Sequence, residues 1–190
     1  MLWHTGTKTL ETERLRLRKF RLCDAKAIYE NWASDPEVSR FLTWRAHSNV
    51  KVTQDVLDSW CRHYTQKAYN WAITLKEINE PVGSIGVVRI NEESLSCDIG
   101  YVLSKKLWGR GIATEAAQAV IRFLFEEVGF ERITALHHYK NQASGRVMQK
   151  LSMEYIRTIP DQYKDNRGNP CPVIMYEIRK ESYEAKKQRP

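Results

Sequence analysis

Residues 101–117 read Y-V-L-S-K-K-L-W-G-R-G-I-A-T-E-A-A. A short run typical of a strand leads into a turn with two glycines one residue apart, Gly109 and Gly111, and an amphipathic helix follows. Glycine allows the backbone to turn with positive φ and lets a ligand approach the main chain closely. The first N–H groups of a helix have no partner and carry the positive end of its dipole. The stretch therefore predicts an anion site that suits a diphosphate.

Two better-known glycine motifs do not match this turn. A Walker A loop has G-x-x-x-x-G-K-[ST], whereas Lys105 and Lys106 come before the glycines. A dinucleotide fingerprint has G-x-G-x-x-G directly after a strand, and here Thr114 stands in place of the third glycine. An ordinary strand-to-helix turn with surface cations remains an alternative. If the turn does bind a diphosphate, the flanking Lys105, Lys106 and Arg110 would add charge-assisted contacts to phosphate oxygens.

Length and composition indicate one globular domain. The chain has 190 residues, of which 42% are hydrophobic and 28% are charged. We expect a single domain over residues 1–190, with an ordered core from about 9 to 180 and a charged, frayed tail from 181 to 190. The four cysteines are widely spaced and form no C-x-x-C pair. This spacing argues against disulfides, a zinc site or another metal centre.

Charge and hydropathy limit the partners. No run approaches the roughly 18 apolar residues of a membrane span, and the first residues lack the apolar region of a signal peptide. We therefore expect a cytoplasmic protein without a membrane partner. The net charge of +7 permits nucleic-acid binding, but the 30 Lys and Arg residues are dispersed among 23 acidic ones, which favours a soluble basic surface. Such a surface would gather CoA or an acidic protein substrate. The sequence does not distinguish a monomer from a homodimer.

The first third of the chain predicts a strand followed by three helices. Leucines alternate with arginines within residues 10–20, which indicates a strand whose arginines face water. Asp24 is a candidate cap for a helix over 25–33, and Asp35 precedes a proline that would start a short helix ending at 41. A longer helix is expected from residue 48 onward. Its core-facing stripe recurs every four residues, at Val52, Val56, Trp60 and Tyr64.

The rest of the chain predicts a mixed sheet. Three strands form an antiparallel meander, over 70–75, 82–90 and 95–103. A helix over 114–127 then crosses to a strand over 133–138, which should lie parallel to the last meander strand. A second helix and a final hairpin follow, over 141–151, 155–159 and 173–178. The predicted class is α/β (α+β), a mostly antiparallel sheet with one central parallel pair and helices on both faces.

The glycine turn and its surroundings resemble a known family. K-x-x-G-x-G followed by A-T-E-A is similar to the acetyl-CoA pyrophosphate loop of the GNAT (GCN5-related) N-acetyltransferases, with Lys106 where many members have Arg or Gln. W-G-R-G-I-A-T-E-A most closely resembles the branch named for the ribosomal-protein N-acetyltransferases. Further fragments occur in the order and spacing of the family, so the resemblance covers nearly the whole chain: T-E-R-L-R-L-R, D-P-E-V, D-I-G-Y-V-L and N-Q-A-S-G-R-V-M-Q-K-L.

The resemblance implies the GNAT fold, in which the two central parallel strands splay apart and acetyl-CoA enters between them without a metal. Backbone groups of residues 101–103 (Tyr101, Val102 and Leu103) would then hold the pantetheine arm like an added strand. Asn141 and Ser144 would point at the thioester from the other side, although Asn-x-x-Ser is also a common helix cap. The remaining cofactor contacts would come from Lys106, Trp108, Gly109, Arg110, Gly111, Ile112, Ala113 and Thr114.

Transfer of an acetyl group to an amine needs a neutral nitrogen, a polarised carbonyl and a proton for the departing sulfur. A typical GNAT places a tyrosine acid at the position of Met148, which cannot donate a proton. The ribosomal-protein branch uses a serine at the position of Ser144, so the resemblance implies that Ser144 serves the sulfur in a direct transfer. Asp98, Asp161 and His138 are candidate bases, and each would otherwise be an ordinary surface group.

The expected acceptor is the α-amine of a protein N-terminus. Near pH 7.4 a lysine amine with a pKa of about 10.4 is roughly 0.1% neutral, whereas an α-amine with a pKa of about 7.7 to 8.0 is some 20 to 30% neutral. An enzyme for α-amines therefore manages with a weak base. Trp44 lies in the segment that lines the acceptor site in the family, and core packing is its alternative role. A small-molecule amine acceptor and a non-catalytic CoA-sensing module remain alternative functions, the latter favoured by Met148 and Lys106.

Overall fold

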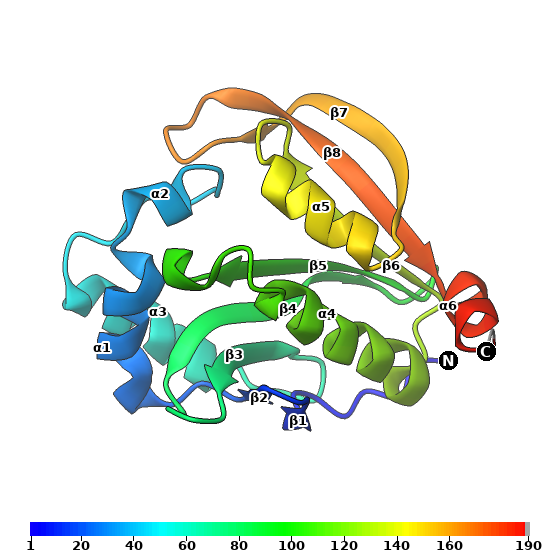
Figure 1. Ribbon diagram of the computed structural model, residues 1–190, viewed down its shortest axis with the longest axis horizontal. Helices are drawn as coiled ribbons and strands as arrows, with labels where there is room; N and C mark the ends of the chain where they lie inside the picture. Colours follow the sequence, from blue (N-terminus) through cyan, green and yellow to red (C-terminus); the bar gives the residue numbers. More distant parts are fainter. Residues whose placement is uncertain (189–190) are drawn as a thin grey trace.

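A computed structural model of the chain describes residues 1–188 and shows an eight-stranded sheet (Figure 1). The strand order is β1-β2-β3-β4-β5-β6-β8-β7, and neighbouring strands are antiparallel except for β5 and β6, which run parallel. This confirms the predicted mixed sheet. The strands are β1 (Leu10–Glu11), β2 (Leu15–Arg18), β3 (Asn70–Leu75), β4 (Pro81–Asn91), β5 (Ser96–Leu103), β6 (Arg132–His138), β7 (Glu154–Lys164) and β8 (Pro170–Arg179).

The helices vary in length, and two of them continue into a wider π-helical turn. These turns span Tyr29–Ala33 after α1 and Leu124–Val128 after α4, while short 3₁₀ turns at Leu22–Asp24 and Lys105–Leu107 precede α1 and the glycine turn. The α-helices are α1 (Ala25–Ile28), α2 (Pro36–Ser39), α3 (Val50–Arg62), α4 (Ile112–Phe123), α5 (Gln142–Lys150) and α6 (Lys180–Lys187).

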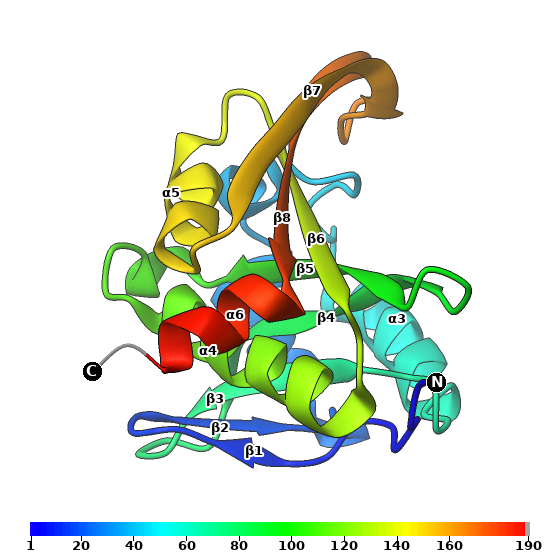
Figure 2. The same ribbon diagram turned by 90° about the vertical axis from the view of Figure 1, so that its right-hand side faces the viewer.

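Helices cover both faces of the sheet (Figure 2). Neighbouring residues of a strand point to opposite faces, and β3 shows this directly. Trp71 and Ile73 are fully buried in the larger hydrophobic cluster, where the Trp71 ring meets Phe123 of α4 edge to face. Ala72, between them, belongs to a second cluster formed with α1 and α3. The predicted two-sided layering is therefore confirmed.

The parallel strands β5 and β6 pair only over their first halves. The paired residues run from Ser96 with Arg132 to Ile99 with Ala135. Beyond Ile99, β5 keeps β4 on one side but has no strand on the other, while β6 continues beside β8. The sheet thus opens between β5 and β6, toward the left of Figure 1, where the glycine turn lies. This is the splayed parallel pair that the resemblance implies.

The predicted N-terminal strand is wrong in part. Residues 10–20 form two short strands, β1 and β2, that pair with each other. Arg16 is exposed as expected, but Arg18 is only 5% exposed and makes a two-pronged ion pair with Asp24, at 2.7 and 2.9 Å. Asp24 also accepts the backbone N–H of Arg21, and its side chain caps no N–H of α1. The buried guanidinium is tolerated because the carboxylate compensates its charge.

The buried residues of α3 each lie one position after the residues predicted to be buried. Asn49 caps the helix, and its buried residues are Thr53 and Leu57, while Val52 of the predicted stripe is 37% exposed. Consecutive helical residues differ by about 100° around the axis, so an error of one position turns the stripe away from the core. Trp60 of the predicted stripe still packs, half-buried, against the second cluster.

The C-terminal segment is more ordered than predicted. Residues 180–187 form α6, in which Tyr183 packs against Phe125 at 5.2 Å and donates a hydrogen bond to Glu126. The predicted frayed tail is therefore wrong for these residues, and positions 189–190 lie outside the described residues. The final hairpin is also longer than predicted, since β7 and β8 extend to a five-residue connection at 165–169.

Candidate active site

The glycine turn has the backbone geometry that its sequence predicts. Gly109 and Gly111 have φ angles of 75° and 77°, which other residues rarely adopt. Gly111 is the N-cap of α4, and no side chain caps the first N–H groups of that helix. A Cβ atom at Gly109 would meet no atom within 4 Å, so the space beside it is open. Free N–H groups at a helix N-terminus next to open space fit a diphosphate.

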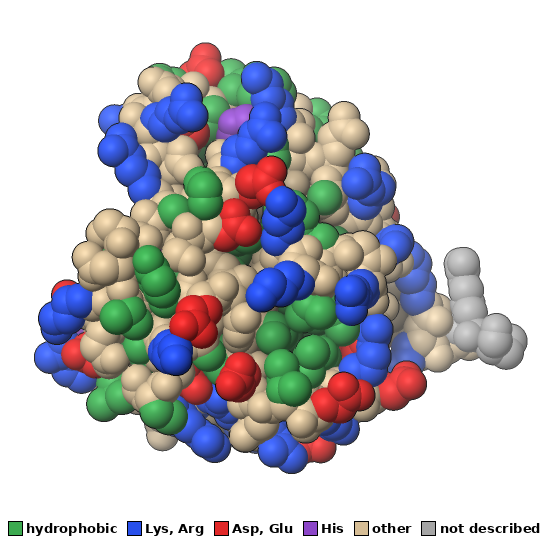
Figure 3. Space-filling model, turned by 60° about the vertical axis from the view of Figure 1, so that its left-hand side comes forward, with side chains coloured by type: hydrophobic (Ala, Val, Ile, Leu, Met, Phe, Trp, Pro, Cys, Tyr) green, Lys and Arg blue, Asp and Glu red, His purple; other side chains and the backbone are tan. Residues whose placement is uncertain are grey.

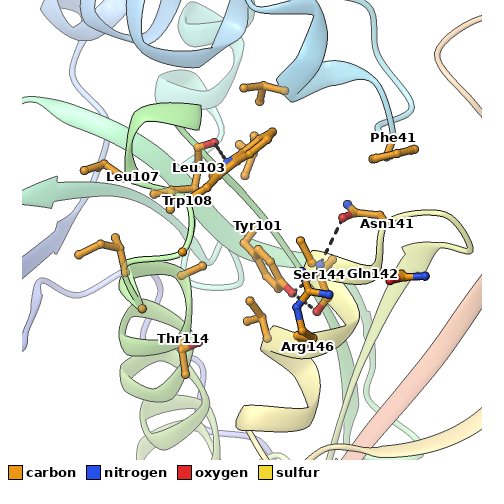
Figure 4. Close-up of a pocket in the computed structure, with 18 of the residues that line it drawn as sticks. Phe41, Tyr101, Leu103, Leu107, Trp108, Thr114, Asn141, Gln142, Ser144 and Arg146 are labelled. Carbon is orange, nitrogen blue, oxygen red and sulfur yellow. Dashed lines mark hydrogen bonds between the residues drawn. The ribbon is translucent and has the colours of Figure 1, made fainter.

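A cavity of about 420 Å³ lies over this turn, between β5, α4 and α5 (Figure 4). It is where the structure brings together most of the cofactor residues predicted from the sequence. Those that line it are Tyr101, Val102, Leu103, Trp108, Gly109, Gly111, Ile112, Ala113, Thr114, Asn141 and Ser144.

The cations at this cavity differ from the predicted ones. Lys106 and Arg110 are exposed and do not belong to its lining, and Lys105 forms an ion pair with Glu37 of α2. Cations on or next to α5 line the cavity instead, namely Lys140, Arg146 and Lys150. The glycine motif does not predict their place in the lining, because that place depends on how α5 packs beside the turn. The last two are one helical turn apart, a spacing that places both on one helix face.

An ion pair that the sequence analysis missed ties the turn to the β1–β2 hairpin. Glu115, in the first turn of α4, accepts hydrogen bonds from Thr12 Oγ1 (2.5 Å) and from the Arg14 backbone N–H (3.0 Å) and Nε (2.7 Å). Arg14 Nη1 donates to the Arg110 carbonyl oxygen inside the turn (3.0 Å). Burial alone would raise the pKa of Glu115, but the hydrogen bonds from Thr12 and Arg14 outweigh it and hold this pKa below 4.5. We call Thr12, Arg14 and Glu115 the clamp.

The free edge of β5 faces the same cavity. Residues 101–103 pair with β4 on one side only, because β6 has already diverged. An extended ligand arm can therefore add to this edge as a further strand would. The Leu103 carbonyl oxygen accepts the Trp108 indole N–H at 2.9 Å, which attaches the start of the turn to the end of the strand (Figure 4).

Ser144 and Tyr101 form a pair of hydroxyl groups where β5 faces α5 (Figure 4). The Tyr101 hydroxyl lies 2.9 Å from Ser144 Oγ and 3.1 Å from the Ser144 carbonyl oxygen. Burial raises the pKa of Tyr101 to about 12, so the phenol stays protonated near neutral pH. Asn141 Oδ1 accepts the Ser144 backbone N–H at 3.2 Å, which confirms the helix-cap role of Asn141. The sequence motif predicted only backbone contacts for Tyr101, so this hydroxyl contact is an addition from the structure.

A second cavity, of about 520 Å³, adjoins the first, and the residues that line both are Phe41, Leu42, Tyr101, Val102, Asn141 and Ser144. His138 and Trp44 line this second cavity, with the aromatic side chains of Phe41, Trp60 and Tyr163. Ser144 therefore lies where the two cavities join, between the glycine turn and an aromatic chamber. This arrangement suits a reaction in which one substrate enters from each side.

The three candidate bases have different surroundings. Burial, together with the Lys140 cation, lowers the pKa of His138, and its Nδ1 accepts the backbone N–H of Lys140 at 3.1 Å. Asp98 lines neither cavity, and its carboxylate is held by Arg89 at 2.6 Å and by Thr134. Asp161 is exposed on β7, away from the lining of both cavities. Of the three candidate bases, only His138 lines a cavity that Ser144 also lines.

His137, next to His138 on β6, has a buried side chain. Its Nδ1 lies 2.9 Å from the His138 carbonyl oxygen and is the donor of that contact, which leaves Nε2 without a proton. Nε2 is buried without a hydrogen-bond partner and faces Gly145 of α5, where an added Cβ would lie 2.9 Å away. Burial lowers the pKa of His137. This ring therefore packs α5 closely onto β6 as a neutral group.

Two further residues lie as the sequence indicates. Met148 is 1% exposed in the larger cluster, so it is a core residue, and its position holds no proton donor. Trp44 is half-buried at the aromatic chamber and 5.5 Å from the His47 ring, and it also packs against the second cluster. Trp44 therefore packs against the core and also forms part of the cavity wall, and its contact with an acceptor stays a prediction.

Comparison with known proteins identifies the family. The chain belongs to the GNAT acetyltransferases, because the family model for an acetyltransferase (GNAT) domain matches residues 14–154. It is 32% identical over 177 residues to the uncharacterized N-acetyltransferase p20 of Bacillus licheniformis, a match that covers 93% of this chain and 98% of p20. The protein is thus an N-acetyltransferase, and its acetyl donor is acetyl-CoA.

Solved structures agree with this assignment. A GNAT-family acetyltransferase from Bacillus anthracis superposes with a TM-score of 0.80 at 27% identity, covering 92% of this chain and 99% of that one. A ribosomal-protein-S5-alanine acetyltransferase from Vibrio fischeri shares the fold, with a TM-score of 0.79 at 18% identity over 93% and 98% of the two chains.

Within residues 1–188 no helix is both long and apolar enough to cross a membrane. No three His, Cys, Asp or Glu side chains of the same residues are grouped so that they could hold a metal ion.

Proposed function

We propose that this enzyme acetylates the α-amino group of a peptide or protein N-terminus. The observation that carries the proposal is the lack of a strong base at Ser144: within residues 1–188, each carboxylate that lines the two cavities is already engaged. Glu37 pairs with Lys105. Asp165 accepts the backbone N–H groups of Arg167 and Asn169 in its own turn.

The histidines at the site do not replace a carboxylate. His138 Nδ1 accepts the Lys140 N–H, so the neutral ring carries its proton on Nε2 and presents a donor to the cleft. His137 Nε2 has a free lone pair but is buried against Gly145. A site with such weak proton acceptors suits an amine that arrives neutral. An α-amine has a pKa about 2.4 to 2.7 units below that of lysine, which makes the neutral form roughly 200 to 300 times more abundant near pH 7.4.

The residues of the site then have separate roles. Acetyl-CoA supplies the acetyl thioester. The glycine turn holds the diphosphate, and the edge of β5 holds the pantetheine arm and orients the thioester at Ser144. The new carbon–nitrogen bond forms as the carbon–sulfur bond breaks, and the nitrogen loses as many protons as the sulfur gains, so the reaction needs no net base.

Ser144 is the donor to the departing sulfur in this proposal. Its Oγ lies where the two cavities join, and the Tyr101 hydroxyl at 2.9 Å fixes its orientation. A donor aimed at the sulfur is most effective when negative charge develops there, and this assistance is typically worth about 10² to 10⁴-fold in rate. Tyr101 acts through Ser144 and is a positioning residue.

The test is a panel of acceptors assayed for CoA release and acetylated product. Short peptides with a free N-terminus are compared with the same peptides carrying a blocked N-terminus and a free lysine, and with polyamines and aminoglycosides. A peptide blocked at the N-terminus and without lysine is the control. We expect acetylation of the free N-termini only. A preference for lysine peptides or for the small amines would contradict the proposal.

A further inference from the structure

A third cavity, of about 820 Å³, lies beside the aromatic chamber and is rich in positive charge. One wall is α2 with the segment that follows it, and the other is the connection between β7 and β8. We call this cavity the basic pocket. The cations that line it are Arg40, Arg45, Lys140 and Arg167, and its only lining carboxylate among the described residues is Asp165.

The four cations of the basic pocket face a single carboxylate among its described lining residues, Asp165, which interacts electrostatically with Arg167. Within residues 1–188 none of them forms an ion pair, whereas Lys105, Arg14 and Arg18 elsewhere all do. Arg40 lies 5.1 Å from the Phe41 ring centre, and Lys140 lies 5.3 Å from that of Tyr139. The Asp165 oxygens accept hydrogen bonds from the backbone of the hairpin connection and from the Asn169 side chain. The pocket therefore keeps an excess of positive charge.

The two walls of the basic pocket are joined by hydrogen bonds. Arg45 Nε donates to the Asn166 carbonyl oxygen at 2.8 Å, and Asn166 Nδ2 donates to the Ser39 carbonyl oxygen at 2.8 Å. These bonds connect segments more than 120 residues apart and tie the two walls of the pocket together. Like charges are thus kept together in a preformed hollow, although they repel one another. Figure 3 shows the face of the molecule that lies to the left in Figure 1, and in its upper part Lys and Arg side chains lie on both sides of a histidine.

The basic pocket is adjacent to the reaction centre. It shares Phe41, His138 and Asp165 with the aromatic chamber, whose lining includes Ser144. One molecule can therefore place an amine in the chamber and a second group in the pocket. One extended residue spans about 3.3 Å, so a side chain within the first few residues of a peptide reaches from the chamber to the pocket.

We propose that the basic pocket binds an anionic oxygen group of the acceptor, a carboxylate or a phosphate located near the α-amine. For a peptide this means an acidic side chain in the first few residues. Arginine forms paired hydrogen bonds with both kinds of group, and Arg40 and Arg167 have guanidinium groups without a hydrogen-bond partner in the described protein. This inference rests on the proposed α-amine acceptor and adds a preference for acidic N-terminal sequences.

The experiment compares matched peptides with free N-termini that carry Glu, Gln, Lys or phosphoserine at positions 2 to 4. The enzymes are the wild type, the double variant Arg40→Gln with Arg167→Gln, and Arg122→Gln as a control. Arg122 is an exposed arginine on α4 that lines none of the three cavities and forms no ion pair among the described residues. Arg45 is left intact because it joins the two walls.

We expect wild-type kcat/KM to be about tenfold higher for the Glu peptides than for the Gln peptides, as for a few partly exposed charge pairs. The double variant should bring this ratio close to one, while Arg122→Gln keeps it. A preference for phosphoserine over Gln supports the pocket equally and identifies the doubly charged group as its ligand. Equal wild-type rates for Glu and Gln peptides would overturn the inference.

The outcomes of this experiment distinguish failure of the basic pocket from failure of the proposed α-amine activity. If free N-termini are acetylated without regard to acidic side chains, the basic pocket is refuted and the α-amine proposal stands. If the double variant raises the KM for acetyl-CoA and leaves peptide selectivity unchanged, the arginines belong to the cofactor site and the inference fails. Acetylation of blocked lysine peptides alone would remove the proposed function itself.

Discussion

Replacement of Glu115 by Gln tests whether the clamp holds the glycine turn in its binding geometry. Glutamine keeps the shape of the side chain but removes the charge and places an amide where one carboxylate oxygen accepts a hydrogen bond. In the wild type that carboxylate accepts from Thr12 Oγ1 at 2.5 Å, from Arg14 N at 3.0 Å and from Arg14 Nε at 2.7 Å. The change therefore weakens several bonds at once.

The expected magnitude follows from these contacts. Hydrogen bonds to a charged group are each worth about 1.5 to 3 kcal/mol when buried, and the Glu115 side chain is 17% exposed. The Arg14 side chain is 46% exposed, so solvent screens much of the ionic part. We expect Glu115→Gln to lower the free energy of unfolding by about 1 to 2 kcal/mol, or Tm by about 2 to 8 °C for a chain of this size.

The same change should weaken cofactor binding. Arg14 Nη1 donates to the Arg110 carbonyl oxygen within the turn, and this contact depends on Glu115 to hold the guanidinium. Loss of one ordering hydrogen bond, at about 1 kcal/mol, predicts a Kd for CoA raised about fivefold. Calorimetric titration with CoA measures the Kd, and differential scanning calorimetry measures Tm.

The control for this experiment is Glu127→Gln. Glu127 pairs with Lys8 at 2.8 Å, but both side chains are about half exposed, so little change is expected. A lower Tm with an unchanged Kd would show that the clamp stabilises the fold without ordering the turn. No change in either quantity would refute the clamp altogether.

Three further predictions concern the cofactor turn, the hydroxyl pair and the response to pH. Gly111→Asp should abolish CoA binding in calorimetry while leaving a cooperatively folded protein, because a carboxylate repels the diphosphate and the strain of the left-handed backbone costs only about 1 to 2 kcal/mol. Ser144→Ala should lower kcat at least tenfold with little change in the KM for acetyl-CoA. Tyr101→Phe should lower kcat in the wild type, but adding it to Ser144→Ala should cause no further loss, because Tyr101 acts through Ser144. Losses that add up in the double variant would contradict this positioning role. Because hydrogen bonds from Thr12 and Arg14 hold the folded-state pKa of Glu115 below 4.5, its contribution to stability is present above that pH and is lost as pH falls through the folded-state value, so the Tm difference between wild type and Glu115→Gln should shrink progressively as pH is lowered below 4.5.

Much of the fold follows from local sequence signals. Alternating apolar and polar residues predict the strands of the meander. The two glycines, which adopt positive φ, predict the turn, and apolar residues at helical spacing predict the helix that crosses from β5 to β6. Arg18 shows where this reasoning ends. Its place in an alternating Leu-Arg pattern predicts exposure, but Asp24 and the segment around it cover that end of β2. Burial of that kind depends on tertiary contacts.

The candidate site was predictable to a similar extent. The turn glycines and the residues of β5 and α5 are found by motif, and they line the expected cavity. Arg14 and Glu115 are 101 positions apart, so their contact follows from the packing of α4 on the β1–β2 hairpin and not from spacing. Lys105 is a predicted site residue whose side chain has another partner in the structure. A flanking cation was expected to reach phosphate, but Glu37 of α2 neutralises it.

The central claim is that this N-acetyltransferase acts on α-amines, and one competition measures it directly. A single peptide with both a free N-terminus and one internal lysine is incubated with enzyme and acetyl-CoA near pH 7.4, and fragment-ion mass spectrometry locates the acetyl group over time. Because both amines are present in one molecule at one concentration, the ratio of products reports the preference of the site. We expect N-terminal product in excess of lysine product by about 10² or more. Equal products, or an excess at the lysine, would contradict it.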